Sequence, residues 1–408
     1  MKLSTDKRTR ILKALRRPAS DQSGAVLVMV AASLVILLGV AGLALDSARG
    51  FVRQARMSKA IDAAVLTGAK TLRSGESQAR QQALAVAAAN GFPDGVNGVN
   101  LDLQFGTNAL GEQTVSMSGL QPMPTLLVKL VGPNSMNVAA AATATIPPVD
   151  LTLVLDQSGS LGQMGAWDDL QDAAWSFVQN FDDNLDQVSL VSFQIGGTLR
   201  VPLQGGFTNP VRNAIYFSGM KSAGYTNPGE GLRLAYEQMT GPDIQARSAK
   251  AVVFFTDGRP TAFRGQISGD DRFLAVPWAT SNRLVGYWDD PVEHPADSYT
   301  SPDGCQNWSS CYGWTEQSGR AQALQEGLDR ANDLRNSGVI IYTVGLGNPF
   351  ESDPMKVPDM DYLSQIANVG GVVDSKQQIG KAYFAPSAAQ LKSVFEQVAQ
   401  DLLVRLSD

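Results

Sequence analysis

Histidine, cysteine and charged residues are all scarce in this chain of 408 residues. One histidine and two cysteines cannot supply the four ligands of a zinc site built only from Cys and His. The same scarcity argues against catalysis by an imidazole or a thiol, and we expect no enzymatic activity. Charged residues make up only 18% of the chain, and the net charge of -6 argues against nucleic acid as a main partner.

Charge is missing altogether between Ala25 and Leu45. At ~1.5 Å per residue, a helix over this run is roughly 30 Å long and matches the hydrocarbon core of a bilayer. A buried core helix and a cleaved signal peptide are the alternatives. A core helix is seldom apolar on every face, however, and a signal peptide has a shorter apolar run. We therefore predict a retained transmembrane helix over residues 25–45.

Basic residues are unevenly distributed around this run. Those before it are Lys2, Lys7, Arg8, Arg10, Lys13, Arg16 and Arg17, and those that closely follow it are Arg49, Arg53, Arg56 and Lys59. The excess on the N-terminal side predicts that residues 1–24 form a cytoplasmic tail and that the bulk of the chain is exported.

Two regions are expected between the span and residue 148. Residues 46–91 are rich in Ala and contain no Pro, which predicts a juxtamembrane helical region. Gly68 and Gly75 are candidate breaks in it. Residues 97–148 predict a small β-rich region that ends at the linker Pro147-Pro148. Its expected strands are residues 100–105, 113–117, 125–130 and 136–144.

The pattern changes over residues 149–405. Short apolar runs such as Leu151–Leu155 are typical of strands buried on both faces of a parallel sheet, and they alternate with helical stretches. This predicts an α/β fold with a doubly wound, mostly parallel sheet. The alternation stops over residues 258–318, which we interpret as an insertion with its own local packing.

Three fragments in this region carry candidate ligands. They are Asp156-Gln157-Ser158-Gly159-Ser160, Gly224-Tyr225-Thr226-Asn227 and Thr256-Asp257-Gly258. The first and third follow predicted parallel strands, at the edge where open α/β sheets place their ligands. Each fragment alone has an ordinary explanation, since Asp-x-Ser-x-Ser often caps a helix and Thr-Asp-Gly is a common turn. Together they supply only oxygen ligands, which suits a hard cation such as Mg²⁺.

These fragments resemble the metal-ion-dependent adhesion site of von Willebrand factor A domains, over roughly Asp150 to Leu403. The resemblance implies direct metal ligation by Ser158 and Ser160, and a conformation-dependent role for Thr226. It also implies that Asp156 and Asp257 act largely through water. Mg²⁺ is the expected ion, with Mn²⁺ and Ca²⁺ as alternatives. Neutral hydroxyl ligands leave the ion net positive, so the expected partner is a protein with an exposed carboxylate.

The N-terminal part resembles the TadE/TadG-like proteins of Flp (tight-adherence) pilus assembly. The residues that carry this resemblance are Gln22-Ser-Gly-Ala25, Gly39-Val-Ala-Gly-Leu-Ala-Leu-Asp46 and the Ala-rich run from Lys59 to Ala69. In prepilin-like relatives a Gly is followed five residues later by Glu, whereas Gly24 is followed at that distance by Met29. This departure favours a permanent anchor over a processed pilin.

The resemblance implies a single-pass protein of a bacterial inner membrane, with its bulk in the periplasm and pilus-assembly components as partners. Oligomerisation remains open. The alternative is a membrane-tethered adhesin or envelope sensor unrelated to pili. In either case Cys305 and Cys311 are expected to form a disulfide, with free thiols, or a metal site that also uses His294, as alternatives. Met164 and Trp167 follow the first fragment and are interpreted as helix packing rather than a ligand rim.

Overall fold

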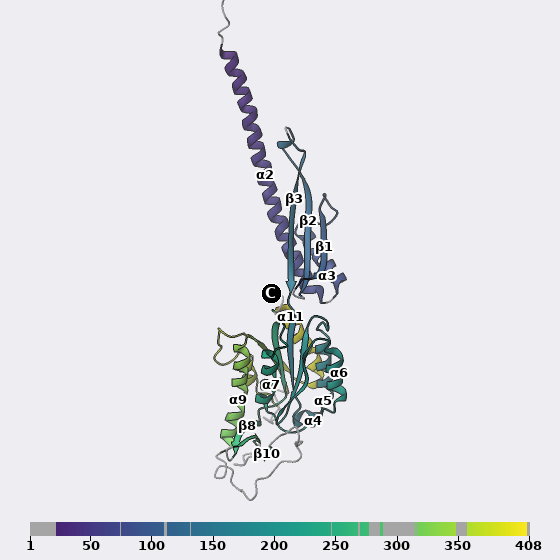
Figure 1. Cartoon of the computed structure of the whole chain (residues 1–408), viewed down its shortest axis with the longest axis vertical. Coiled ribbons are helices and arrows are strands. Elements are labelled where there is room, and N and C mark those ends of the chain that lie inside the picture. Colours follow the sequence, from purple (N-terminus) through teal and green to yellow (C-terminus); the bar gives the residue numbers. More distant parts are fainter. Residues whose placement is uncertain are drawn as a thin grey trace, which may run out of the picture. The chain divides into compact units, whose positions relative to one another are not determined.

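The computed structural model describes residues 22–405 apart from 74, 110–111, 131, 246, 268–269, 277–285, 289–313, 315 and 348–356. The described chain forms two compact units, whose elements are labelled in Figure 1. The first unit contains the described residues up to 68, together with 80–104 and 115–144. The second contains residues 69–79 and 105–114 and the described chain from Thr145 onward.

A single continuous helix, α2 (Gln22–Leu72), contains the whole apolar run. Its most apolar window has a mean hydropathy of 2.8 and is 6% buried, so by length and composition the helix can cross a membrane. An N-terminal signal sequence would meet the same criteria. The break after α2 falls at the predicted Gly75, which has a φ of +111° and precedes α3 (Glu76–Ala89). The other candidate, Gly68, lies within α2.

The second half of α2 packs against a three-stranded sheet in the first unit. The strands lie in the order β1 (Asn100–Thr107), β2 (Gln113–Pro124) and β3 (Ser135–Ile146). In β2, alternate residues from Val115 to Gln121 are buried, as expected for a strand with one face on a core. Gly119 allows α2 and β1 to approach closely, because a β-carbon there would lie 2.8 Å from Ile61 Cδ1 and 3.0 Å from Leu101 Cδ2.

The predicted strand over residues 125–130 is wrong. Strand β2 ends at Pro124 and a short 3₁₀ helix, η1 (Val128–Leu130), follows. The backbone N–H groups of Leu126, Leu127 and Val128 donate to the Asp46 carboxylate over 2.9–3.0 Å, so a side chain replaces the neighbouring strand as their acceptor. These bonds, that of Val128 foremost, hold the pKa of Asp46 at about 2.

The second unit is built on a six-stranded sheet in the order β12-β11-β7-β4-β5-β6. The strand pairs are parallel except for the antiparallel pair of β5 and the edge strand β6. The strands are β4 (Val149–Asp156), β5 (Gln187–Phe193), β6 (Gly197–Gln204), β7 (Ala249–Thr256), β11 (Ile340–Leu346) and β12 (Lys381–Ala385). The prediction of a mostly parallel α/β sheet is confirmed.

Helices cover both faces of this sheet (Figure 1). Leu151, Leu153 and Leu155 of β4 pack on one face with α5 (Trp167–Val178), α6 (Thr208–Phe217) and α11 (Leu391–Arg405). Met164 and Trp167 also pack against this cluster. Val154 packs on the other face, which is covered by α7 (Pro228–Thr240), α9 (Glu316–Asn336) and α10 (Met360–Ile366). The short α4 (Gly159–Gln163) follows β4, and η3 (Ala388–Gln390) precedes α11.

The described part of the 258–318 segment forms a second small sheet. Its antiparallel strands are β8 (Ala262–Ile267), β9 (Asp270–Ala275) and β10 (Gly286–Trp288), in the order β10-β9-β8. Phe263, Leu274 and Val276 form a cluster with Ala323 of α9, and Trp314 packs against it. The insertion therefore rests on α9 through its own apolar contacts.

The close contact at Gly119 generates a testable prediction for the first unit. We expect Gly119→Val to destabilise the sheet by about 1–3 kcal/mol, because the new side chain overlaps Ile61 and Leu101. Amide hydrogen exchange of β1–β3 in the detergent-solubilised chain measures the change. Leu120→Val is the matched control, since Leu120 is 43% exposed on the opposite face and its replacement should change stability by less than about 0.5 kcal/mol. Equal effects of the two substitutions would contradict this packing.

Candidate functional site

Two buried carboxylates lie at the ends of neighbouring parallel strands. Asp156 is the last residue of β4, and Asp257 follows Thr256, the last residue of β7. The register of the two strands pairs Leu155 with Phe255, so the residues that follow emerge side by side. Both carboxylates are fully buried, with 0% of either residue exposed.

Two serine hydroxyls converge on Asp257. Ser160 Oγ donates to Asp257 Oδ1 over 3.0 Å, and Ser158 Oγ approaches the same oxygen at 3.4 Å. The two hydroxyl oxygens lie 3.0 Å apart. The strand end and the start of α4 therefore bring together three of the five predicted ligands.

Asp156 holds the base of the same loop. Its Oδ1 accepts the backbone N–H of Ser158 over 2.7 Å, and its Oδ2 accepts the hydroxyl of Thr256 over 2.5 Å. Thr256 also receives the N–H of Gly258 over 3.2 Å. Asp156 thus joins the ends of β4 and β7.

Thr226 completes the set from a separate loop. A β-carbon at Gly258 would lie 3.7 Å from Thr226 Oγ1 and 4.0 Å from Ser160 Oγ, so both hydroxyls face the same small space. Gly258 keeps that space open because it has no side chain. The structure therefore brings all five predicted residues to one edge of the sheet.

The electrostatic environment of Asp156 and Asp257 favours a bound cation. Burial raises the pKa of Asp257 well above its ordinary value, and the nearby Asp156 raises it further. Burial also raises the pKa of Asp156. Asp257 Oδ2 is buried and has no hydrogen-bond partner among the described residues. Two adjacent carboxylates with an orphaned oxygen, surrounded by hydroxyls, fit a divalent metal ion with oxygen ligands.

Two residues, Ser222 and Gly224, fix the two ligand loops to each other, and Ser222 was not predicted from the sequence. Ser222 receives the N–H of Gly162 over 2.7 Å and donates to the carbonyl of Ser158 over 2.6 Å. Gly224, with a φ of +80°, turns the chain so that its carbonyl accepts the N–H of Gly159 over 3.1 Å. Gly224 belongs to one of the predicted fragments, whereas Ser222 could not be predicted because serine is a common residue in loops.

The Thr226 loop is also held by the insertion. The N–H of Thr226 donates to Thr261 Oγ1 over 2.8 Å, and its carbonyl accepts the N–H groups of Thr261 and Ala262 over 2.8 and 2.9 Å. On the other side, Asn227 caps α7 through the N–H of Glu230 and donates from Nδ2 to the carbonyl of Ile195. Thr226 is therefore held between Thr261 and Ala262, where β8 begins, and the start of α7.

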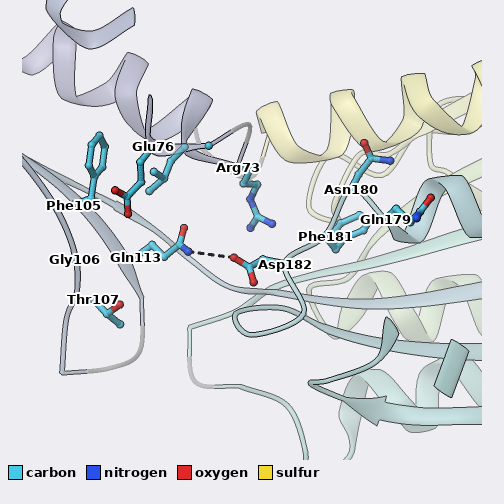
Figure 2. A pocket seen from close by; sticks show the side chains of 12 residues that line it. Arg73, Glu76, Phe105, Gly106, Thr107, Gln113, Gln179, Asn180, Phe181 and Asp182 are labelled. Carbon is cyan, nitrogen blue, oxygen red and sulfur yellow. Dashed lines mark hydrogen bonds between the residues drawn. The ribbon is translucent and has the colours of Figure 1, made fainter. Parts of the chain in front are cut away.

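A cavity elsewhere in the second unit plays no part in this site. It has a volume of about 460 Å³, and Figure 2 shows Arg73, Gln113 and Asp182 among its lining residues, with Gln113 Nε2 donating to Asp182 Oδ2 over 3.4 Å. None of the five predicted ligands lines it. In the described part of the chain there is also no group of three or more His, Cys, Asp or Glu side chains that could hold a metal. Cys305, Cys311 and His294 lie outside the described residues, so the disulfide stays a prediction.

Comparison with known proteins identifies part of the second unit. A family model described as von Willebrand factor type A domain matches residues 150–269. No curated protein matches the sequence.

Several solved structures are similar at low identity. The PilB minor pilin from Streptococcus sanguinis is 18% identical, with a TM-score of 0.44, over 77% of this chain and 80% of that chain. The pilus adhesin SpaC from Lactobacillus rhamnosus GG is 17% identical, with a TM-score of 0.39, over 76% of this chain and 35% of that chain. Proximal thread matrix protein 1 from the mussel byssus, solved with a zinc-occupied MIDAS motif, is 16% identical. Its TM-score is 0.38, over 63% of this chain and 48% of that chain.

Likenesses at this level carry no argument about function. The family match is different, because it falls on the segment that contains β4, β5 and β7 and all five predicted ligands. The second unit therefore contains a von Willebrand factor type A domain, which the family model matches over residues 150–269.

Proposed function

We propose that this chain is a membrane-anchored binding protein that captures a protein partner through a divalent cation at the sheet edge. The observation that carries the proposal is the convergence of Ser158 and Ser160 on Asp257, whose second carboxylate oxygen is buried without a partner among the described residues. A buried, charged carboxylate without a partner is costly, and a bound cation would remove that cost.

The ligand set favours Mg²⁺, with Mn²⁺ and Ca²⁺ as alternatives. Ser158 and Ser160 would ligate the ion directly and Thr226 would supply a third hydroxyl, while Asp156 and Asp257 would act largely through water. When bound, the ion supplies positive charge that three neutral hydroxyls do not cancel. Its open position therefore suits the carboxylate of a partner protein, and the role is binding rather than catalysis.

We propose that the anchor holds this site outside the cytoplasm. In the proposed topology α2 crosses a bacterial inner membrane, the basic residues 1–24 stay in the cytoplasm, and the domain lies in the periplasm. The support is the apolar and exposed first half of α2 together with the excess of Lys and Arg before it.

The partner system is proposed from the resemblance of the N-terminal part to TadE/TadG-like proteins. The chain would then serve a Flp/Tad-type pilus assembly or secretion apparatus and bind one of its other components. A membrane-tethered adhesin or envelope sensor is the alternative. A Flp pilus gene cluster beside this gene would favour the first role.

The charge pair predicts opposite effects of Asp257→Asn with and without metal. In EDTA at neutral pH, we expect the variant to be more stable than the wild type by about 1 kcal/mol or more, because it removes the cost of burying the Asp257 charge and, second, the repulsion from Asp156. Mg²⁺ at a hundredfold excess over its Kd should then stabilise the wild type by about 2.7 kcal/mol and the variant far less. Calorimetry and thermal unfolding measure the two effects.

The control is Asp329→Asn, which removes an exposed carboxylate from α9 and should leave metal binding unchanged. Equal Mg²⁺ affinity of wild type and Asp257→Asn would rule out this site.

The clamp on Thr226 predicts that Thr261 positions the metal loop. We expect Thr261→Val to weaken Mg²⁺ binding and to cost about 1–3 kcal/mol of stability, because the buried N–H of Thr226 loses its acceptor. Thr261→Ser keeps the hydroxyl and should restore the affinity. Hydrogen exchange at the Thr226 amide separates the two variants, and wild-type exchange and affinity in Thr261→Val would contradict the role.

Crosslinking in the native host tests the partner. Wild-type protein should crosslink to a pilus-assembly component, and Asp156→Ala should lose that product while its membrane level is maintained. Loss of the strand tie to Thr256 and Ser158 is the physical reason. A pilus-component crosslink that survives in Asp156→Ala would show that the metal site does not mediate the contact. A metal-dependent crosslink to another envelope component would favour the alternative role.

A further inference from the structure

The turn between β2 and β3 contacts α2 at residues 42–46. Gly42 and Asp46 are buried and lie one helical turn apart. A β-carbon at Gly42 would lie 2.7 Å from Leu127 Cβ, so the glycine lets the turn approach the helix backbone closely. Asp46 receives the three N–H groups of residues 126–128. The turn is thus bonded to α2 over residues 42–46.

That level coincides with the end of the apolar run. The uncharged stretch ends at Leu45, and Asp46 is the first charged residue after it. Leu43 and Leu45 are 57% and 49% exposed on the same helical turn that Gly42 begins. If α2 crosses a bilayer, the β2–β3 turn lies at the boundary between hydrocarbon and headgroups.

The chemistry of the turn suits that boundary. Residues 122–130 contain no acidic side chain, and Leu126 and Leu127 are 47% and 42% exposed. Neighbouring Lys129 is exposed as well. Exposed leucines beside a cation are typical of segments that lie about 5–10 Å deep in the interfacial layer, with the cation at the headgroups.

The buried Asp46 fits the same surroundings. Its charge is satisfied by three backbone N–H groups and by Arg49, whose Nη1 lies 3.2 Å from Asp46 Oδ1. The carboxylate therefore does not have to face lipid, and Leu43 and Leu45 of α2 and Leu126 of the turn are exposed apolar residues.

We propose that the β2–β3 turn is a second membrane contact, which inserts Leu126 and Leu127 into the interfacial layer of the leaflet at the C-terminal end of the span. The occupant of this surface is the bilayer itself, because the turn is bonded to α2 where its apolar run ends and exposes two leucines there. The proposal rests on the membrane span of the proposed function. A helix held to the membrane both by its span and by a bonded turn cannot rotate freely about its axis, so the turn would fix which face of the first unit points toward the membrane.

Fluorescence quenching by lipid tests the insertion. The full chain is reconstituted into phosphatidylcholine vesicles as wild type, Leu126→Trp and the control Leu120→Trp, which places the new indole at an exposed site on β2. The six native tryptophans, all between residues 167 and 314, give a common background that the wild type supplies for subtraction. Lipids brominated near the headgroup end of the acyl chain, or near its terminus, report the depth of the added indole.

We expect the added emission of Leu126→Trp to be blue-shifted and to lose most of its intensity with the shallow bromine label, and less with the deep one. Leu120→Trp should be unquenched by either. Emission of Leu126→Trp at the wavelength of an indole in water, without quenching, would overturn the proposal. Strong quenching of both variants would also overturn it, since the contact would then not be specific to the turn.

Alkaline carbonate extraction separates failure of the turn from failure of the anchor. If the wild-type protein stays in the membrane pellet and Leu126→Trp is unquenched, only the proposed contact of the turn is contradicted. If the wild-type protein is released into the supernatant, the proposed membrane span is contradicted, and the proposed contact of the turn with it. Neither outcome bears on metal binding by the A domain, which is measured separately.

Discussion

Two carboxylates share one buried edge of the sheet in the second unit, and much of the local structure follows from keeping them there. The parallel pairing of β4 with β7 places Asp156 and Asp257 beside each other. Two unit charges about 4 Å apart repel by about 4 kcal/mol at an effective dielectric constant of about 20, so an unrelieved pair is expensive. Asp156 is satisfied by Ser158 and Thr256, whereas Asp257 keeps one oxygen without a partner in the described structure. The uncompensated charge therefore lies at Asp257, which the hydroxyls of Ser158 and Ser160 contact.

This arrangement couples metal binding to loop geometry. Ser222 bonds the loop that carries Ser158 and Ser160 to the loop that carries Gly224 and Thr226. Thr261 bonds this second loop to the insertion. A change in any of these loops moves an oxygen that faces the site. The insertion therefore does more than extend the domain, because its first residues hold one of the proposed ligands in place.

The parts of the structure that the sequence revealed are those with a strong local pattern. Apolar strands with polar residues at their ends predicted both the parallel sheet and the meeting of Asp156 with Asp257. The β2–β3 turn was mistaken for a strand because Thr125–Leu130 is apolar and β-branched in part, and only the structure shows that Asp46, some 80 residues earlier, takes its N–H groups. Ser222 and Thr261 were missed for the same reason: their partners are distant in sequence and their residue types are ordinary in loops.

The central claim is that the sheet edge of the A domain holds a divalent cation, and anomalous scattering tests it most directly. Crystals of the protein grown with Mn²⁺ should show an anomalous peak at coordination distance from Ser158 Oγ and Ser160 Oγ, with waters bridging to Asp156 and Asp257. A map without a peak there, in which Asp257 Oδ2 is instead hydrogen-bonded within the protein, would contradict the account.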